Sequence, residues 1–255
     1  MSAVAPDALA DRSVLVVGAS AGIGRAFASR AIAAGATVAV VGRRAERLAE
    51  LVDGAPSAVV VAGDIRAPAD CSRIVAEASA AMGGIDLLVY CAGSSPLRPL
   101  ADTTVDDWAT VFETHVLGVH HIVREALAHM PRHGVVAVLS SETVGRPRYG
   151  LGAYGASKAA LDQLLHTFRV EHPHIRFTTV TVGATFPTEF GDGFDPEVLG
   201  RAMTEWARHG LMTEEMMNPD EVAAVLAGVA AAALSNPSVG VEHLVVRPPS
   251  PVLGS

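Results

Sequence analysis

The sequence predicts an α/β fold in which short strands alternate with helices around one parallel sheet. Apolar, β-branched runs recur along the chain, and a segment of helical character follows nearly every one of them. The expected strands are residues 13–18, 37–42, 58–62, 86–91, 134–140, 175–182 and 242–247. The expected helices are residues 22–34, 44–53, 68–82, 106–130, 152–171 and 219–234. Such a sheet binds its ligand beyond the carboxyl ends of the strands.

Length and composition favour one domain over residues 1–255, because no proline- or serine-rich linker divides the 255 residues. The longest apolar run, 222–234, is too short to span a bilayer, and the first residues lack the features of a secretion signal. Two cysteines, Cys71 and Cys91, argue against a disulfide framework and favour a cytoplasmic location. The net charge of -8 argues against nucleic acid as a partner.

A glycine-rich loop joins the first expected strand to the first expected helix. Its glycines are spaced Gly-x3-Gly-x-Gly, and no Gly-Lys-Ser/Thr follows them. Bare backbone at such positions approaches a pyrophosphate closely, and the N-terminus of the next helix attracts the anion. A purely structural turn is the alternative. The predicted phosphate-binding residues are Gly18, Ser20, Ala21, Gly22, Ile23 and Gly24.

Two arginines, Arg43 and Arg44, follow the second expected strand. An NAD-selective site would usually place a carboxylate here to accept hydrogen bonds from the ribose 2′-hydroxyl, whereas guanidinium groups suit a 2′-phosphate. The pair therefore predicts NADP(H) rather than NAD(H). In the alternative interpretation, these arginines and Arg47 pair with Glu46 and Glu50 on a solvated helix face.

Further candidate cofactor residues follow the third and fourth expected strands. Asp64, with Ile65 beside it, is placed to accept a hydrogen bond from an adenine amine. The small pair Ala92 and Gly93 would let a ring or ribose approach the backbone. Both segments are equally compatible with ordinary turn chemistry.

The most specific constellation combines a serine-ended strand with a helix that carries Tyr154 and Lys158. The strand ends at Ser141, and the tyrosine and lysine are four residues apart, so they share one helix face. An ammonium beside a phenol favours the phenolate, which predicts a pKa for Tyr154 below its ordinary value of about 10. The alternative is a surface Tyr–Lys pair.

With these motifs in this order, the chain resembles the short-chain dehydrogenase/reductase family over nearly its whole length. The resemblance implies a single Rossmann-type domain, a doubly wound parallel sheet with helices on both faces, in a homotetramer or homodimer. It implies hydride transfer between a nicotinamide and a carbonyl or alcohol. Tyr154 would act as general acid or base, Lys158 would hold the nicotinamide ribose, and Ser141 would bind the substrate oxygen.

Three segments depart from the family pattern. His115 stands where the family commonly has an asparagine that seats a water in a proton relay, which leads to the hypothesis of a modified relay. A histidine packed at a helix irregularity is the alternative. Tyr90-Cys91 replaces two asparagines, and we expect only a structural change there. After the sixth strand, Gly183 can still admit the nicotinamide carboxamide, with either Thr185 or Thr188 as its partner.

Residues 184–217 correspond to the family's substrate-covering region. They contain three phenylalanines, Trp206 and four of the seven methionines, which predicts an adaptable apolar cover over a hydrophobic carbonyl compound. Ordinary helix packing is the alternative. Arg146, Arg148 and Tyr149 are candidates to meet a polar group on the substrate, whereas Glu142 would disfavour an anion there. The ten histidines are scattered, so no metal site is expected.

The leading hypothesis is an NADP(H)-dependent reductase or dehydrogenase of the ketoreductase type. A non-redox enzyme on the same fold, such as a dehydratase, cyclase or dehalogenase, is a second hypothesis, prompted by His115 and the altered turns. A cofactor-sensing binding protein is a third. Turnover that changes the nicotinamide absorbance distinguishes the first from the other two.

Overall fold

The computed structural model describes residues 9–249, and both chain ends, including the segment examined for a secretion signal, lie outside this range. Seven parallel strands form one sheet in the order β3-β2-β1-β4-β5-β6-β7. This order confirms the predicted doubly wound α/β sheet. The strands are β1 (Ser13–Val17), β2 (Thr37–Gly42), β3 (Ala58–Ala62), β4 (Leu87–Tyr90), β5 (Val135–Ser141), β6 (Arg176–Val182) and β7 (His243–Val246).

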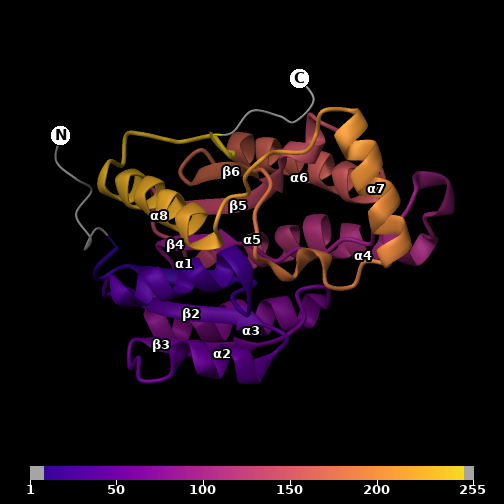
Figure 1. Ribbon diagram of the computed structural model, residues 1–255. Helices are drawn as coiled ribbons and strands as arrows, with labels where there is room; N and C mark the ends of the chain where they lie inside the picture. Colours follow the sequence, from indigo (N-terminus) through magenta and orange to yellow (C-terminus); the bar gives the residue numbers. More distant parts are fainter. Residues whose placement is uncertain (1–8, 250–255) are drawn as a thin grey trace.

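Helices cover both faces of the sheet (Figure 1). The principal helices are α1 (Gly22–Ala33), α2 (Ala45–Val52), α3 (Pro68–Met82), α4 (Val105–Phe112), α5 (Gly118–Ala126), α6 (Gly152–Glu171), α7 (Pro196–Arg208) and α8 (Pro219–Ser235). Five short turns accompany them: η1 (Leu100–Asp102), η2 (Glu113–Leu117), η3 (Leu127–His129), η4 (Glu142–Val144) and η5 (Glu189–Gly191). Within residues 9–249, no helix is long and apolar enough to cross a bilayer.

Two buried clusters hold the layers together. Helices α1 and α8 pack against each other and bury residues such as Phe27 and Leu226 on one face of the sheet. Helices α3, α5 and α6 bury residues such as Ile74, Ile122 and Leu161 on the other face. Strands β1, β2 and β4 are almost wholly buried and therefore lack polar alternation, as expected inside a parallel sheet, whereas the edge strand β7 is partly exposed.

The order of the strands in the sheet reverses at β1 and β4, and sheets of this kind bind ligands beyond the carboxyl ends of the strands at such a point. Strand β1 pairs with β2 on one side and with β4 on the other, so the segments that leave β1 and β4 diverge beyond their carboxyl ends. The glycine-rich loop, Ala92, Ser141 and Gly183 all follow strands at this edge.

The single helix predicted over 106–130 is wrong, because a π-helical segment, η2, interrupts it between α4 and α5. The buried hydroxyl of Tyr90, on β4, donates a hydrogen bond to the Thr114 carbonyl oxygen in this segment at 2.7 Å. An external donor thus satisfies a carbonyl within the wider turn. From the sequence, only a structural change is expected at Tyr90-Cys91, and this hydrogen bond is a structural contact that Tyr90 makes beside the helix irregularity at His115.

Helix α7 was not expected from the sequence, which indicated only a covering segment. Asp195 caps its N-terminus through hydrogen bonds from the backbone N–H groups of Glu197 and Val198. The helix packs in a third apolar cluster that contains Leu97, Leu151, Ala202, Tyr154, Phe190 and Trp206. In Figure 1, α7 lies at the end of the molecule near α4, away from the main core.

Candidate active site

The glycine-rich loop is held against the ends of β2 and β4. The backbone N–H of Gly18 donates to the Val41 carbonyl oxygen at 2.9 Å. Gly18 has φ +88°, and a Cβ there would lie 2.5 Å from the Ala92 nitrogen. A Cβ on Gly24 would lie 2.2 Å from the Gly18 oxygen. These approaches require bare backbone, and the resulting cradle at the N-terminus of α1 fits a pyrophosphate.

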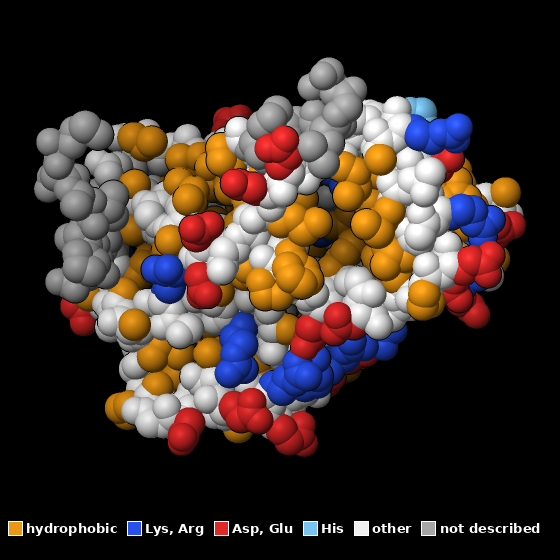
Figure 2. Space-filling view, in the orientation of Figure 1, with side chains coloured by type: hydrophobic (Ala, Val, Ile, Leu, Met, Phe, Trp, Pro, Cys, Tyr) orange, Lys and Arg blue, Asp and Glu red, His pale blue; other side chains and the backbone are white. Residues whose placement is uncertain are grey.

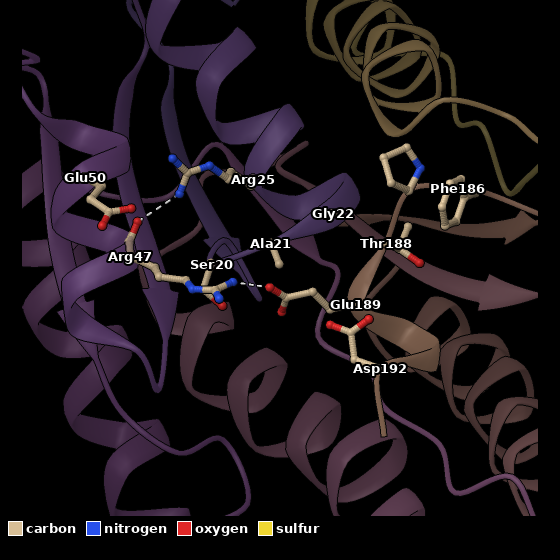
Figure 3. A pocket seen from close by; sticks show the side chains of 11 residues that line it. Ser20, Ala21, Gly22, Arg25, Arg47, Glu50, Phe186, Thr188, Glu189 and Asp192 are labelled. Carbon is tan, nitrogen blue, oxygen red and sulfur yellow. Dashed lines mark hydrogen bonds and ion pairs between the residues drawn. The ribbon is translucent and has the colours of Figure 1, made fainter. Parts of the chain in front are cut away.

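An open cleft of about 710 Å³ extends from this loop (Figure 3). One wall consists of Ser20, Ala21 and Gly22 from the loop, together with side chains from α1 and α2. The other wall comes from the segment after β6, where Thr188 lies closest to the loop: a Cβ on Gly22 would be 3.7 Å from its Cγ2. Of the two threonines proposed for the cofactor, Thr188 therefore lines this cleft, whereas the Thr185 hydroxyl donates to the Gly183 carbonyl oxygen at 3.0 Å.

The arginines beyond β2 pair with a residue far along the chain. Arg44 Nη1 lies 2.7 Å from Glu189 Oε2, and Arg47 also forms an ion pair with Glu189. The alternative interpretation, in which these arginines pair with Glu46 and Glu50, is therefore wrong: Glu189 reaches across the cleft from η5 and takes that place. Arg44 also donates to the Ser20 hydroxyl at 2.7 Å, which ties it to the glycine-rich loop.

The candidate adenine-binding segment has its own local partners. The Asp64 carboxylate forms an ion pair with Arg66 at 2.6 Å, and this hydrogen bond holds the pKa of Asp64 below its ordinary value. Its backbone N–H donates to Asp70 at 2.9 Å. The neighbouring Ile65 is buried in the core beneath. Contact of Asp64 and Ile65 with a cofactor, and of the exposed Arg43 with a 2′-phosphate, stay predictions.

Ser141, Tyr154 and Lys158 lie together beyond β5, as the sequence predicts. A hydrogen bond between Ser141 and Tyr154 lowers the pKa of the phenol, but burial of the hydroxyl outweighs it and raises that pKa to about 12. The ammonium of Lys158 lies 5.8 Å from the Tyr154 ring centroid and donates to the Leu139 carbonyl oxygen at 2.7 Å. The expectation of a lowered pKa for Tyr154 is therefore wrong in this arrangement, because the lysine is directed at the backbone.

Lys158 itself is almost fully buried, and the loss of water around its ammonium lowers its pKa to about 8. The nearby carboxylate of Asp162, one turn further along α6, opposes this shift. Lys158 therefore remains charged at neutral pH and loses its proton in mildly alkaline solution.

His115 is fully buried between Tyr154, Ser157 and Ser94. Its ring meets the Tyr154 ring edge to face, with the centroids 5.3 Å apart. Nε2 accepts a hydrogen bond from the Ser94 N–H at 3.3 Å, and Nδ1 lies 2.8 Å from the Ser157 hydroxyl. Because that hydroxyl donates to the Tyr154 carbonyl oxygen at 2.7 Å, Nδ1 must carry the proton. Burial, assisted by the charge of Lys158, holds the pKa of His115 well below its ordinary value.

A buried ion pair stands directly beside Ser141. The carboxylate of Glu142 pairs with Arg148, and Arg247 Nε lies 3.5 Å from its second oxygen. The Arg148 guanidinium stacks over Trp206 of α7 at 5.7 Å. Arg148 is therefore committed to Glu142 and Trp206, and Arg146 donates to the Gly210 carbonyl oxygen at 3.4 Å. Both arginines, considered from the sequence as substrate contacts, thus connect the segment after β5 to the region 184–217 that follows β6.

The sequence reasoning did not assign several residues of the cleft. Arg25, Glu189 and Asp192 are given no role from the sequence, and Arg47 and Glu50 are considered only as partners on a helix surface. Residues of η5 and α2 are far apart in the sequence, so no sequence motif predicts that they face each other across the cleft. Among residues 9–249, no cluster of histidine, cysteine and acidic side chains could hold a metal ion.

Residues 12–196 match the family described as short chain dehydrogenase. A glucose 1-dehydrogenase from Gluconobacter oxydans is 36% identical over 72% of this chain and 73% of its own length. An NADP-dependent 3-hydroxy acid dehydrogenase from Shigella flexneri is 33% identical over 70% of this chain and 75% of its own length. A short chain dehydrogenase from Burkholderia cenocepacia, solved in complex with NADP, superposes with a TM-score of 0.81 at 28% identity, covering 94% of this chain and 97% of that one. The chain belongs to the short-chain dehydrogenase/reductase family, a family of oxidoreductases.

Proposed function

We propose that this oxidoreductase is a ketoreductase-type enzyme that transfers hydride between NADP(H) and a carbonyl or alcohol substrate. The observation that carries the proposal is the meeting of Ser141, Tyr154 and Lys158 at the carboxyl end of β5, next to the phosphate cradle. The backbone packs so closely at Gly18 and Gly24 that no Cβ fits there, which supports the binding of a dinucleotide at this loop. We expect the enzyme to form a homodimer or homotetramer.

Two observations support NADP(H) as the cofactor. Arg44 and Arg47 converge at the end of β2, where a 2′-phosphate would meet guanidinium groups. The similar enzyme from Shigella flexneri is NADP-dependent, and the similar structure from Burkholderia cenocepacia contains NADP. The cofactor would be held by the glycine-rich loop, Arg44, Arg47 and Thr188, with Ala92, Gly93 and Gly183 providing close backbone approach.

The bound nicotinamide would supply or accept the hydride at the substrate carbon. The Tyr154 phenol donates its proton to the substrate oxygen during reduction and takes it back during oxidation. A pKa of about 12 keeps this phenol protonated at neutral pH, which suits an acid in the reducing direction. Ser141 donates a hydrogen bond to the same oxygen and orients it, while Lys158, whose ammonium donates to the Leu139 carbonyl oxygen, would hold the nicotinamide ribose.

The substrate is proposed to be largely apolar. Figure 2 shows a hollow ringed by hydrophobic side chains on the side of the molecule that carries α7. Tyr154 belongs to the apolar cluster beneath α7, and its ring lies 5.1 Å from that of Phe190. The carboxylate of Glu142 next to Ser141 disfavours an anionic group beside the reacting oxygen.

Absorbance at the nicotinamide band, measured with purified protein, NADPH or NADH, and a panel of alkyl and aryl ketones, tests this proposal. We expect consumption of NADPH, matched by alcohol formation, at a higher kcat/KM than with NADH. Product formation without a change in absorbance would support the non-redox hypothesis instead. Tight cofactor binding with no turnover across the panel and its corresponding alcohols would favour the sensor hypothesis.

We propose that His115 positions Tyr154 and does not relay protons. Both of its ring nitrogens are engaged, and it supports the backbone of Tyr154 through Ser157. His115→Ala is expected to lower the free energy of unfolding by about 3 kcal/mol, because a buried ring and two hydrogen bonds are lost. Since His115 stays neutral, the shape of the kcat profile between pH 6 and 9 should not change. Loss of an inflection in that range would identify His115 as a proton carrier.

A further inference from the structure

The carboxylate of Glu189 lies between two arginines at the end of the cleft that the cofactor adenosine is expected to occupy. Its Oε2 lies 2.7 Å from Arg44 Nη1, and its Oε1 pairs with Arg47. The Arg44 guanidinium also donates to the Ser20 hydroxyl at 2.7 Å, and the backbone carbonyl oxygen of Arg47 accepts a hydrogen bond from the Arg25 side chain at 3.0 Å. Figure 3 shows Glu189 extending toward Arg47 across the cleft.

A carboxylate and a phosphate use the same guanidinium donors. Burial raises the pKa of Glu189, but hydrogen bonds from Arg44 and Arg47 exceed that effect, so the pKa lies below its ordinary value and the group is ionised at neutral pH. A phosphate monoester carries more charge and one more oxygen than a carboxylate. At this position, it would therefore be the stronger ligand for both arginines.

We propose that Glu189 is an internal competitor for the 2′-phosphate of NADP(H). In the free protein, its carboxylate holds the phosphate position, and the incoming phosphate displaces it from Arg44 and Arg47. The inference rests on the proposed use of NADP(H). Because Glu189 belongs to η5, within the substrate-covering region, the displacement releases the turn Glu189–Gly191 from α2, while Thr188 keeps its place beside the glycine-rich loop. NAD(H) lacks the phosphate and leaves the ion pairs in place.

The ion pairs of Glu189 with Arg44 and Arg47 must be weak enough for the 2′-phosphate to displace them each time the cofactor binds. The side chains are 43% exposed for Arg44, 47% for Arg47 and 35% for Glu189. Ion pairs with this exposure contribute little to stability and are screened by salt. The pairs are therefore strong enough to bias the turn and weak enough to yield to a doubly charged ligand.

Glu189→Gln tests the competition directly. Without the competing charge, the Kd for NADPH, measured by nicotinamide fluorescence, is expected to fall by about three- to tenfold, whereas the Kd for NADH changes less than about twofold. Glu50→Gln and Asp192→Asn are matched controls: both carboxylates line the cleft, and neither forms an ion pair with Arg44 or Arg47 in the described part of the chain. An equal gain in all three variants, no gain, or weaker binding in Glu189→Gln would overturn the proposal.

Hydrogen–deuterium exchange of the turn Glu189–Gly191 tests its release from α2. Adenosine 2′,5′-bisphosphate is expected to accelerate exchange in the wild-type protein, whereas adenosine 5′-monophosphate at equal occupancy is not. In Glu189→Gln, exchange should be fast before any nucleotide is added. Identical responses to the two nucleotides would contradict the release. If the wild-type protein binds NADPH no more tightly than NADH, the proposed cofactor preference fails together with this inference. If the wild-type protein prefers NADPH but Glu189→Gln has the same Kd for NADPH as the wild type, only this inference is overturned.

Discussion

Replacing Tyr154 with phenylalanine is expected to lower kcat by about 10²- to 10⁴-fold, because the substitution removes the only atom proposed to exchange a proton with the substrate. The ring keeps its neighbours, since His115 and Phe190 contact it through its aromatic faces and edges. The Kd for NADPH and the melting temperature should therefore stay near their wild-type values. Nicotinamide absorbance gives kcat, and fluorescence titration gives Kd.

Tyr149→Phe is the matched control for this experiment. Tyr149 packs in the same apolar cluster, so the variant removes a phenol from the neighbourhood without touching the proposed proton donor. We expect kcat to change less than about threefold, because the proposed proton donor is intact, while loss of the substrate contact considered for Tyr149 would raise KM instead. A Tyr154→Phe enzyme that retains full kcat would exclude Tyr154 as the acid, and a comparable loss in Tyr149→Phe would point to disruption of the apolar cover instead.

The sheet could be predicted from the sequence because its signals are local. Strands such as β2 and β3 are short runs of apolar, mostly β-branched residues. The start of helix α8 is marked by Asn218 and Pro219, which are the N-cap and the first helical residue in the structure. The location of the residues at the carboxyl ends of the strands follows from the topology of the sheet alone. Parallel strands bring Ser141, Gly18 and Ala92 to one edge whatever their side chains touch.

The missed features depend on partners that are distant in sequence. The π-helical segment accepts a hydrogen bond from the Tyr90 hydroxyl on β4. Because Tyr90 lies outside residues 106–130, the hydrophobic pattern of those residues cannot reveal this contact. Glu189 and Arg47 are brought together only by folding. The raised pKa of Tyr154 and the lowered pKa of Lys158 both follow from burial, which a four-residue spacing on a helix does not reveal.

The second large effect is expected at the ion pair beside Ser141, the serine proposed to bind the substrate oxygen. The side chains of Glu142 and Arg148 are only 9% and 11% exposed, and Arg148 Nε has no hydrogen-bond partner within the described residues. Glu142→Gln leaves the Arg148 guanidinium buried without its carboxylate. The free energy of unfolding should therefore fall by about 3 to 5 kcal/mol, measured by urea denaturation.

Two further variants distinguish the buried charge from a general effect of charge removal. Glu205→Gln breaks an exposed pair with Arg208 and should cost less than about 1 kcal/mol. The double variant Glu142→Gln with Arg148→Met should recover much of the lost stability, because methionine keeps an apolar stem beside Trp206 and introduces no charge. If the double variant is no more stable than Glu142→Gln, the uncompensated charge of Arg148 is not the cause of the lost stability.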